Sequence, residues 1–174
     1  LDDALAIIDE LAARPRVRAV GETGLDFFRT EAAGLPAQFR SFEAHIDIAK
    51  RHDIALQIHD RDAHDDVLET LERVGAPATT VFHCFSGDAE MARYCAERGY
   101  YLSFAGNVTF KNAQKLRDAL MVAPRERVLI ETDAPFLIPH TLRFMAGVLG
   151  EDADVLAADI AANTVRAYGE WAQQ

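Results

Sequence analysis

The amino-acid sequence predicts an α/β protein in which helices cover a sheet of parallel strands. Five short apolar runs recur along the chain, and most are rich in β-branched or aromatic residues, as buried strands are. Amphipathic stretches with helical spacing separate the runs, and this alternation with short loops is typical of a parallel sheet. The 174 residues, 49% of them hydrophobic, are enough to bury the core of one globular domain.

The positions of the expected elements follow from this pattern. The strands are expected over residues 17–20, 54–58, 79–82, 100–104 and 128–130. Apolar residues at helical spacing predict helices near residues 1–11, 39–49, 67–71, 91–95 and 116–121. Ser86-Gly-Asp88 could cap the fourth of these helices, because a side-chain oxygen at a helix start accepts hydrogen bonds from backbone N–H groups. Residues 138–174 look only helical, and no linker or internal repeat divides the chain.

The composition limits the classes of function. A net charge of −10 argues against a basic protein that coats DNA, but it leaves open a nuclease whose bound divalent ions supply positive charge. The two cysteines, Cys84 and Cys95, fit no zinc motif and are expected to be reduced, buried thiols. No apolar run approaches 18 residues, and residues 1–11 lack the features of a signal peptide. We therefore expect a cytoplasmic protein with no membrane contact, no obligate protein partner and a monomeric state.

Four residues that could bind metal follow the expected strands. Glu22, His59, His83 and Asp133 each come at or just after the C-terminal end of a strand, about one or two βα units apart. Because the C-terminal ends of parallel strands face one side of the fold, these side chains are expected to converge there. Two imidazoles and two carboxylates suit Zn²⁺, Mn²⁺ or Fe²⁺, and Mg²⁺ less naturally.

Each of the four has a structural alternative when taken alone. A single histidine at a strand end is more often a hydrogen-bonded structural residue than a ligand. Glu22 could cap a helix or form a salt bridge, and Asp133 before Ala134-Pro135 could start a turn. Four such residues at equivalent positions favour a metal site, because a bound cation offsets the cost of burying the carboxylates.

Strand alternation assigns roles to two neighbours of these residues. If His83 points inward, Cys84 points out towards the helices, and if Asp133 points inward, so does Glu131. Glu131 could then orient a metal ligand, or it could pair with an arginine.

The remaining candidate residues are expected to lie outside the site. His45 and His52 are expected at the surface or at a helix end, and His64 at a helix start. For Arg61 and Lys111 we favour solvated surface charge over contact with an anionic substrate.

Four motifs resemble those of the TatD family of metal-dependent deoxyribonucleases, in the family's order and over nearly the whole chain. They are Gly21-Glu-Thr-Gly-Leu-Asp26, Ile58-His59 with Arg61-Asp-Ala63, Phe82-His-Cys-Phe-Ser-Gly87 and Glu131-Thr-Asp-Ala-Pro-Phe136. The resemblance implies a (β/α)8 TIM barrel of the metal-dependent hydrolase type. It implies two divalent metal ions per subunit (Mg²⁺, Mn²⁺ or Zn²⁺) and hydrolysis of DNA phosphodiester bonds, typically as a 3′-exonuclease.

The same resemblance implies a role for each of the four residues. Glu22 would bridge the two metal ions and act in catalysis. His59 and His83 would bind one ion. Asp133 would bind the other and would hold or deprotonate the attacking water. Two cations about 3.5–4 Å apart can generate hydroxide and offset the charge on the phosphate.

The chain departs from the family pattern at two places. It has no segment with the His-x-His pair that opens the family's barrel, and only about five of eight strands are visible. The basic loop that follows the Thr-Asp motif in the family is also absent, and Leu137 runs directly into Ile138. We expect a single barrel domain over residues 1–174 that lacks its N-terminal strands and has a gap between 137 and 138.

Two other functions compete with a deoxyribonuclease. One is a related barrel hydrolase of small amides, lactones or phosphoesters, because a fold does not determine the substrate. The other is a protein that binds metal without catalysis. The Gly-Glu-Thr-Gly-Leu-Asp and Phe-His-Cys-Phe-Ser-Gly motifs favour the nuclease.

Overall fold

The computed structural model describes residues 1–132 and 137–170. The chain divides into two compact units, residues 1–82 and 83–174. Strands and helices alternate through both units, and every strand pairing described within a unit is parallel, which confirms the predicted α/β class. None of the described helices is both long and apolar enough to cross a bilayer.

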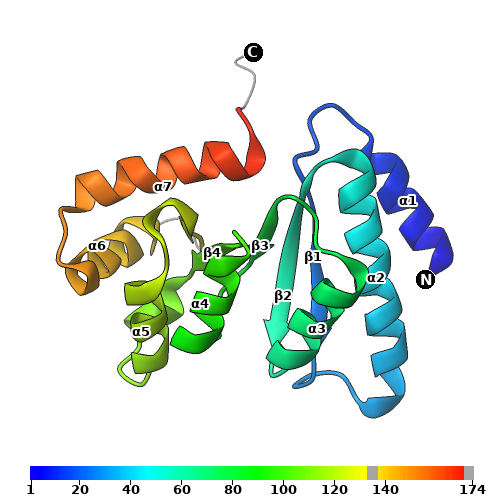
Figure 1. Ribbon diagram of the computed structural model, residues 1–174, viewed down its shortest axis with the longest axis horizontal. Helices are drawn as coiled ribbons and strands as arrows, with labels where there is room; N and C mark the ends of the chain where they lie inside the picture. The colour runs from blue at the N-terminus through cyan, green and yellow to red at the C-terminus, as the bar shows by residue number, and fades with distance from the viewer. Residues whose placement is uncertain (133–136, 171–174) are drawn as a thin grey trace. The chain divides into compact units, whose positions relative to one another are not determined.

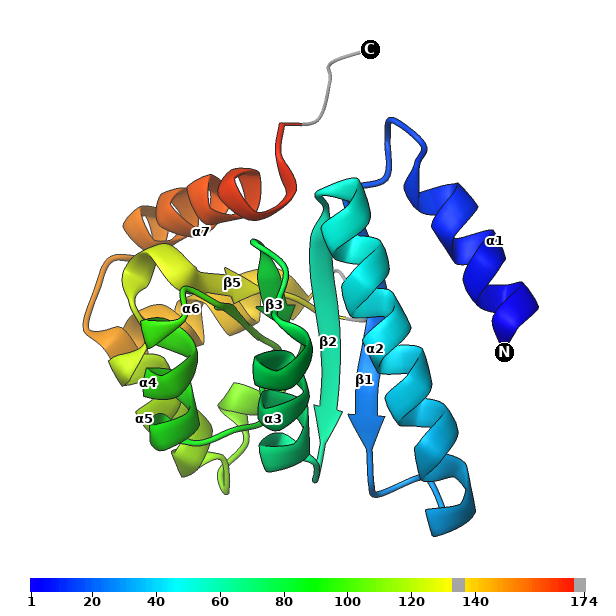
Figure 2. The same ribbon diagram turned by 45° about the vertical axis from the view of Figure 1, so that its right-hand side comes forward.

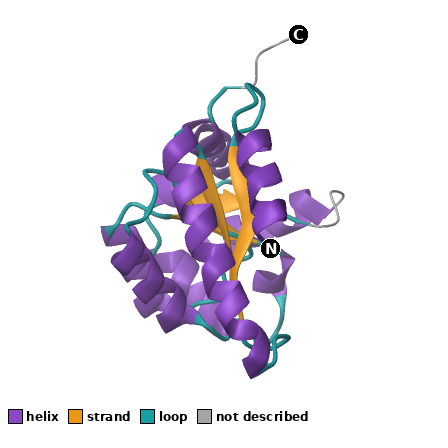
Figure 3. Cartoon of the chain, turned by 90° about the vertical axis from the view of Figure 1, so that its right-hand side faces the viewer, coloured by secondary structure: helices purple, strands orange, loops and turns teal. Residues whose placement is uncertain are grey.

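The first unit consists of three parallel strands and the helices between them. Its elements are α1 (Asp2–Ala12), β1 (Ala19–Asp26), α2 (Leu35–His52), β2 (Ala55–Arg61), α3 (His64–Val74) and β3 (Thr80–Phe82). β1 pairs with β2, and β2 pairs with β3. Figures 1 and 2 show α2 lying along the two long strands, and Figure 3 shows those strands side by side with helices around them.

The first strand is longer than the sequence predicted. The apolar run ends at Val20, but β1 continues through Glu22 to Asp26. The polar stretch stays in the sheet because its backbone pairs with β2, from Thr23 opposite Ile58 to Asp26 opposite Arg61. The expectation that Glu22 and His59 mark strand ends was therefore wrong, since both lie inside their strands.

Alternation along β1 and β2 gives the two strands one apolar face and one polar face. Leu25, Leu56 and Ile58 share the apolar face and are fully buried, as are Phe42 and Ile46 of α2. The polar face carries Glu22, Gly24 and Asp26 of β1 with His59 and Arg61 of β2. Burial of the apolar face thus fixes the register that gathers the polar residues.

The second unit has two parallel strands and four helices within its described residues. These elements are α4 (Ala89–Glu97), β4 (Tyr101–Phe104), α5 (Gln114–Val122), β5 (Val128–Ile130), α6 (Ile138–Leu149) and α7 (Ala153–Tyr168). Asp88 caps α4 as predicted, because its carboxylate accepts hydrogen bonds from the Glu90 and Met91 amides. The C-terminal stretch is helical as expected, within the residues described.

A buried asparagine on α7 ties this helix to β5. Asn163 is fully buried, and its amide nitrogen donates to the carbonyl oxygens of Arg125 at 2.8 Å and Val128 at 2.7 Å. These two carbonyls flank the start of β5, so the side chain satisfies backbone groups that would otherwise be buried without a partner.

We predict that Asn163→Ala destabilises the protein by about 1–3 kcal/mol, because two buried carbonyls lose their donor. The free energy of unfolding from urea titration measures this effect. Val165→Ala changes an exposed residue of the same helix and should stay close to wild type. Equal losses in the two variants would show that the Asn163 hydrogen bonds contribute nothing specific.

Candidate metal centre

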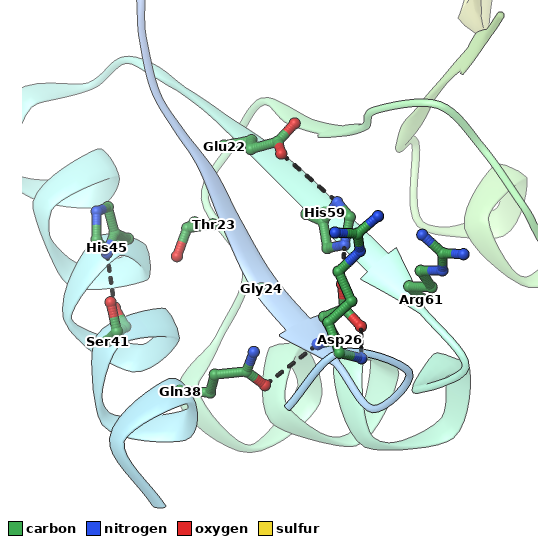
Figure 4. A pocket seen from close by; sticks show the side chains of 10 residues that line it. Glu22, Thr23, Gly24, Asp26, Gln38, Ser41, His45, His59 and Arg61 are labelled. Carbon is green, nitrogen blue, oxygen red and sulfur yellow. Dashed lines mark hydrogen bonds and ion pairs between the residues drawn. The ribbon is translucent and has the colours of Figure 1, made fainter. Parts of the chain in front are cut away.

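His59 lies between two carboxylates of the neighbouring strand. It pairs with Gly24 in the β1–β2 ladder, and Glu22 and Asp26 flank that glycine on the same face. The His59 Nε2 atom is 3.2 Å from Asp26 Oδ2, and the Nδ1 atom is 3.6 Å from Glu22 Oε1 (Figure 4). The ring therefore faces a different carboxylate with each of its nitrogens.

Gly24 makes this arrangement possible. Its φ of +146° is a conformation that side chains rarely adopt, and a Cβ atom there would collide with the carbonyl oxygen of His59. Glycine at this position therefore lets the backbones of β1 and β2 approach closely beside His59.

The two distances fit a histidine that binds metal through Nδ1. At 3.2 Å, Nε2–H can donate to Asp26, which leaves the lone pair of a neutral ring on Nδ1, facing Glu22. The 3.6 Å gap from Nδ1 to Glu22 exceeds the length of a good hydrogen bond. It is close to the roughly 3.4 Å that separates two ligands of one tetrahedral ion with bonds of about 2.1 Å. Glu22 and His59 could thus hold one cation together.

Asp26 is a site residue that the sequence analysis missed. Its side chain is only 14% exposed. Burial raises the pKa of the carboxyl, but hydrogen bonds from the Arg29 amide and the His59 ring outweigh burial and bring the pKa below its usual value. An ionised Asp26 is the partner that orients a metal-binding imidazole. The available signal was its spacing, since Glu22 and Asp26 are four residues apart on one strand.

The second unit contains a similar pair. His83 follows β3 directly, and its Nδ1 atom is 2.9 Å from Glu131 Oε1, just after β5. Burial raises the pKa of Glu131, but hydrogen bonds from His83, Ser103 and the Cys84 amide lower it further than burial raises it. With Nδ1–H donating to this carboxylate, the lone pair of His83 lies on Nε2. Glu131 therefore orients the His83 ring, whereas the metal binding of His83 stays a prediction.

The other predicted ligand cannot be placed. Asp133 lies outside the described residues. Within the ranges 1–132 and 137–170, no three His, Cys, Asp or Glu side chains gather closely enough to form a metal site by themselves. What the structure brings together is Glu22 with His59 and Asp26 in the first unit, and His83 with Glu131 in the second.

An open pocket of about 550 Å³ extends from Glu22 and His59 along the C-terminal half of β1. Arg29 and Arg61 line it, and for Arg61 this position is compatible with either of its two predicted roles. His45 of α2 also lines it, is only 8% exposed and lies 2.7 Å from the Ser41 carbonyl through Nδ1 (Figure 4). His45 is therefore buried, contrary to prediction, because the side of α2 that carries it packs against β1.

His64 lies where the sequence predicted it, at the start of α3. Its Nδ1 atom is 2.7 Å from Oδ2 of Asp60, a buried residue of β2 that projects to the face opposite His59. The hydrogen bond and charge of Asp60 raise the pKa of His64 above its usual value. This pair fastens α3 to β2.

The cysteines behave as ordinary thiols. Both are free of disulfides, as expected. Cys95 is buried, but Cys84 is half-buried, with the Asn107 amide nitrogen 3.7 Å from its sulfur.

The sequence matches one family model, TatD-related DNase, over residues 1–169. Among curated proteins, it is 42% identical over 192 residues to "Uncharacterized metal-dependent hydrolase TatD" of Mycobacterium tuberculosis, covering 99% of this chain and 73% of that protein. It is 37% identical over 182 residues to "3′-5′ ssDNA/RNA exonuclease TatD" of Shigella flexneri, covering 93% of this chain and 70% of that protein. The chain spans about half to three-quarters of the length of the curated relatives it matches.

A solved structure shares the fold. The TatD homologue YJJV of Escherichia coli matches with a TM-score of 0.91 and 28% sequence identity, covering 98% of this chain and 72% of that protein. The similarity confirms the predicted metal-dependent hydrolase type of α/β fold, which in this family is a TIM barrel.

We predict that Gly24→Ala lowers the free energy of unfolding by about 1–3 kcal/mol or more, because a Cβ atom strains the backbone and pushes β1 away from His59. Urea unfolding and metal affinity by isothermal titration should both show the loss. Gly147→Ala in α6 is the matched control, since a Cβ atom there meets nothing within 4 Å. If Gly24→Ala bound metal as wild type does, the close contact of the two strands would not matter to the site.

We predict that the Asp60–His64 pair makes stability depend on pH. Because the pKa of His64 is raised in the folded state, its stabilising effect is complete below the unfolded value of about 6.5 and is lost as the pH rises through the folded value. The free energy of unfolding should therefore fall as the pH rises above about 6.5, and His64→Gln should flatten this slope. An unchanged slope in that variant would assign the pH effect to other groups.

Proposed function

Because the chain belongs to the family of TatD-related DNases, we propose that it hydrolyses phosphodiester bonds in nucleic acid with the help of bound divalent metal ions. The observation that carries the proposal is the position of His59 between Glu22 and Asp26. One imidazole nitrogen meets a carboxylate that orients the ring, and the other faces a carboxylate at a separation that suits shared binding of a cation. A histidine that only stabilised the fold would not need both.

The proposed ligands are the four residues that the sequence motifs single out. Glu22 would bridge two ions, His59 and His83 would bind one of them, and Asp133 would bind the other. His59 and His83 each have a carboxylate within 3.2 Å of one ring nitrogen, and donation to that carboxylate would leave the opposite nitrogen for a metal. This repeated arrangement supports equivalent roles for the two histidines.

The donor set suits hydrolysis. Bound divalent ions lower the pKa of a water molecule and offset the negative charge of a phosphodiester. Asp26 and Glu131 keep the imidazoles oriented, so each ring is preorganised before the substrate arrives. Asp133 would hold or deprotonate the attacking water. Arg29 and Arg61 would bind the phosphate oxygens, because both line the pocket beside Glu22 and His59.

We propose single-stranded DNA as substrate, attacked from the 3′ end. The support is the relative from Shigella flexneri, whose name describes a 3′-5′ exonuclease of single-stranded DNA and RNA. We also propose that residues 1–174 form part of one barrel domain, which agrees with a single family match over residues 1–169.

A hydrolase of small amides, lactones or phosphoesters remains the competing proposal. The purified protein, loaded in turn with Mg²⁺, Mn²⁺ and Zn²⁺, should shorten a 5′-labelled single-stranded oligonucleotide one nucleotide at a time. The same preparations are assayed on generic carboxylic esters and amides. Turnover of these small substrates without cleavage of the oligonucleotide would overturn the nuclease proposal in favour of its competitor.

We predict that Glu22→Gln lowers both bound metal and oligonucleotide cleavage at least ten-fold, because the amide keeps the shape but removes the charge. Elemental analysis of dialysed protein gives the metal content. Glu43→Gln is the control, since Glu43 pairs with Arg73 at the exposed surface of α2. Wild-type metal content in Glu22→Gln would make Glu22 a structural residue.

A further inference from the structure

An exposed aromatic side chain stands beside the pocket. Phe28 follows β1 by two residues and is 63% exposed, whereas its neighbour Phe27 packs against Phe39 of α2 with ring centroids 6.4 Å apart. A single exposed apolar residue is common and means little by itself. What distinguishes Phe28 is its contact with a residue of the pocket.

The guanidinium group of Arg61 lies over the Phe28 ring. Its central carbon is 4.1 Å from the ring centroid, within the range of a cation–π contact. The strand ladder holds the segment just before Phe28 beside Arg61, because Asp26 pairs with Arg61 and the Phe27 amide donates to the Arg61 carbonyl at 3.0 Å. A stacked guanidinium keeps its N–H groups in the plane, where they can reach phosphate oxygens.

The two arginines of this pocket differ from other arginines of the chain in their ion pairing. Acidic residues outnumber basic ones by 28 to 18, and many arginines pair with carboxylates, as Arg40, Arg51 and Arg73 do. Arg29 and Arg61, by contrast, form no ion pair with any carboxylate in the described ranges. Two arginines without a carboxylate partner thus line one pocket of an otherwise acidic protein.

An aromatic ring beside arginines is the combination that binds single-stranded nucleic acid. Bases stack on aromatic rings and on guanidinium planes, while arginines contact the backbone. In a duplex the bases already stack on each other, so a ring at a pocket edge reaches only an unpaired base. We propose that Phe28, with Arg61 on one face, is the platform on which a base of single-stranded DNA or RNA stacks, while Arg29 and Arg61 bind the adjoining phosphates.

This inference rests on the proposed function, and binding without turnover tests it. Fluorescence anisotropy with a labelled single-stranded oligothymidylate, in EDTA and low salt, gives the affinity of the intact protein. Phe28→Ala should weaken binding about ten-fold, and Phe28→Leu should weaken it as much, because leucine is apolar but has no ring. Phe28→Trp should restore wild-type affinity.

A matched control removes a similar aromatic contact elsewhere. Arg98 lies over the Tyr94 ring of α4 at 3.4 Å, so Tyr94→Ala also takes an aromatic ring from an arginine. It should leave affinity unchanged. Arg61→Gln should flatten the dependence of binding on salt by about one phosphate contact. Thermal melts confirm that each variant is folded.

The outcomes separate the two proposals. If the wild-type protein binds and cleaves the oligonucleotide but Phe28→Ala or Phe28→Leu binds as tightly, the stacking platform is wrong and the nuclease proposal stands. If wild type neither binds nor cleaves single strands, both are wrong. Weak binding by Phe28→Ala and Phe28→Leu, with recovery in Phe28→Trp, establishes the platform.

Discussion

The close contact between β1 and β2 at Gly24 is the constraint on which the candidate site depends. The backbone there has no space for a Cβ atom, because the carbonyl of His59 occupies it. This close approach of the two backbones places the His59 imidazole beside Glu22 and Asp26 on the polar face. Burial of Leu25, Leu56 and Ile58 on the opposite face holds the register of the two strands. The packing of the core therefore also determines where the candidate ligands lie.

The carboxylates beside His59 and His83 differ in their burial and in their contacts with the rings. Asp26 and Glu131 are mostly buried, and hydrogen bonds from histidine and backbone keep both ionised despite the cost of burial. Glu22 is about half exposed and faces His59 at a distance too long for a good hydrogen bond. The buried carboxylates therefore fix the rings, and the exposed one remains suited to a cation.

Much of the fold and of the candidate site could be predicted from the sequence, and the failures have physical reasons. Apolar runs located each strand of the described residues, but they did not reveal the polar half of β1, whose backbone stays in the sheet through its pairing with β2. Glu22, His59 and His83 were found because metal-binding residue types recur near strand ends. Asp26 was missed because the sequence of its polar motif does not reveal that the carboxylate contacts His59. His45 was misjudged because its burial comes from the packing of α2, through contacts that spacing does not encode.

The tie between Asn163 and β5 has a consequence for how the protein is made. The amide of Asn163 contacts carbonyls 38 and 35 residues earlier in the chain, at the start of the strand that leads to Glu131 and Asp133. During synthesis on a ribosome these carbonyls emerge well before their donor, since α7 is translated afterwards. The carbonyls of Arg125 and Val128 therefore gain this donor only after α7 has left the exit tunnel.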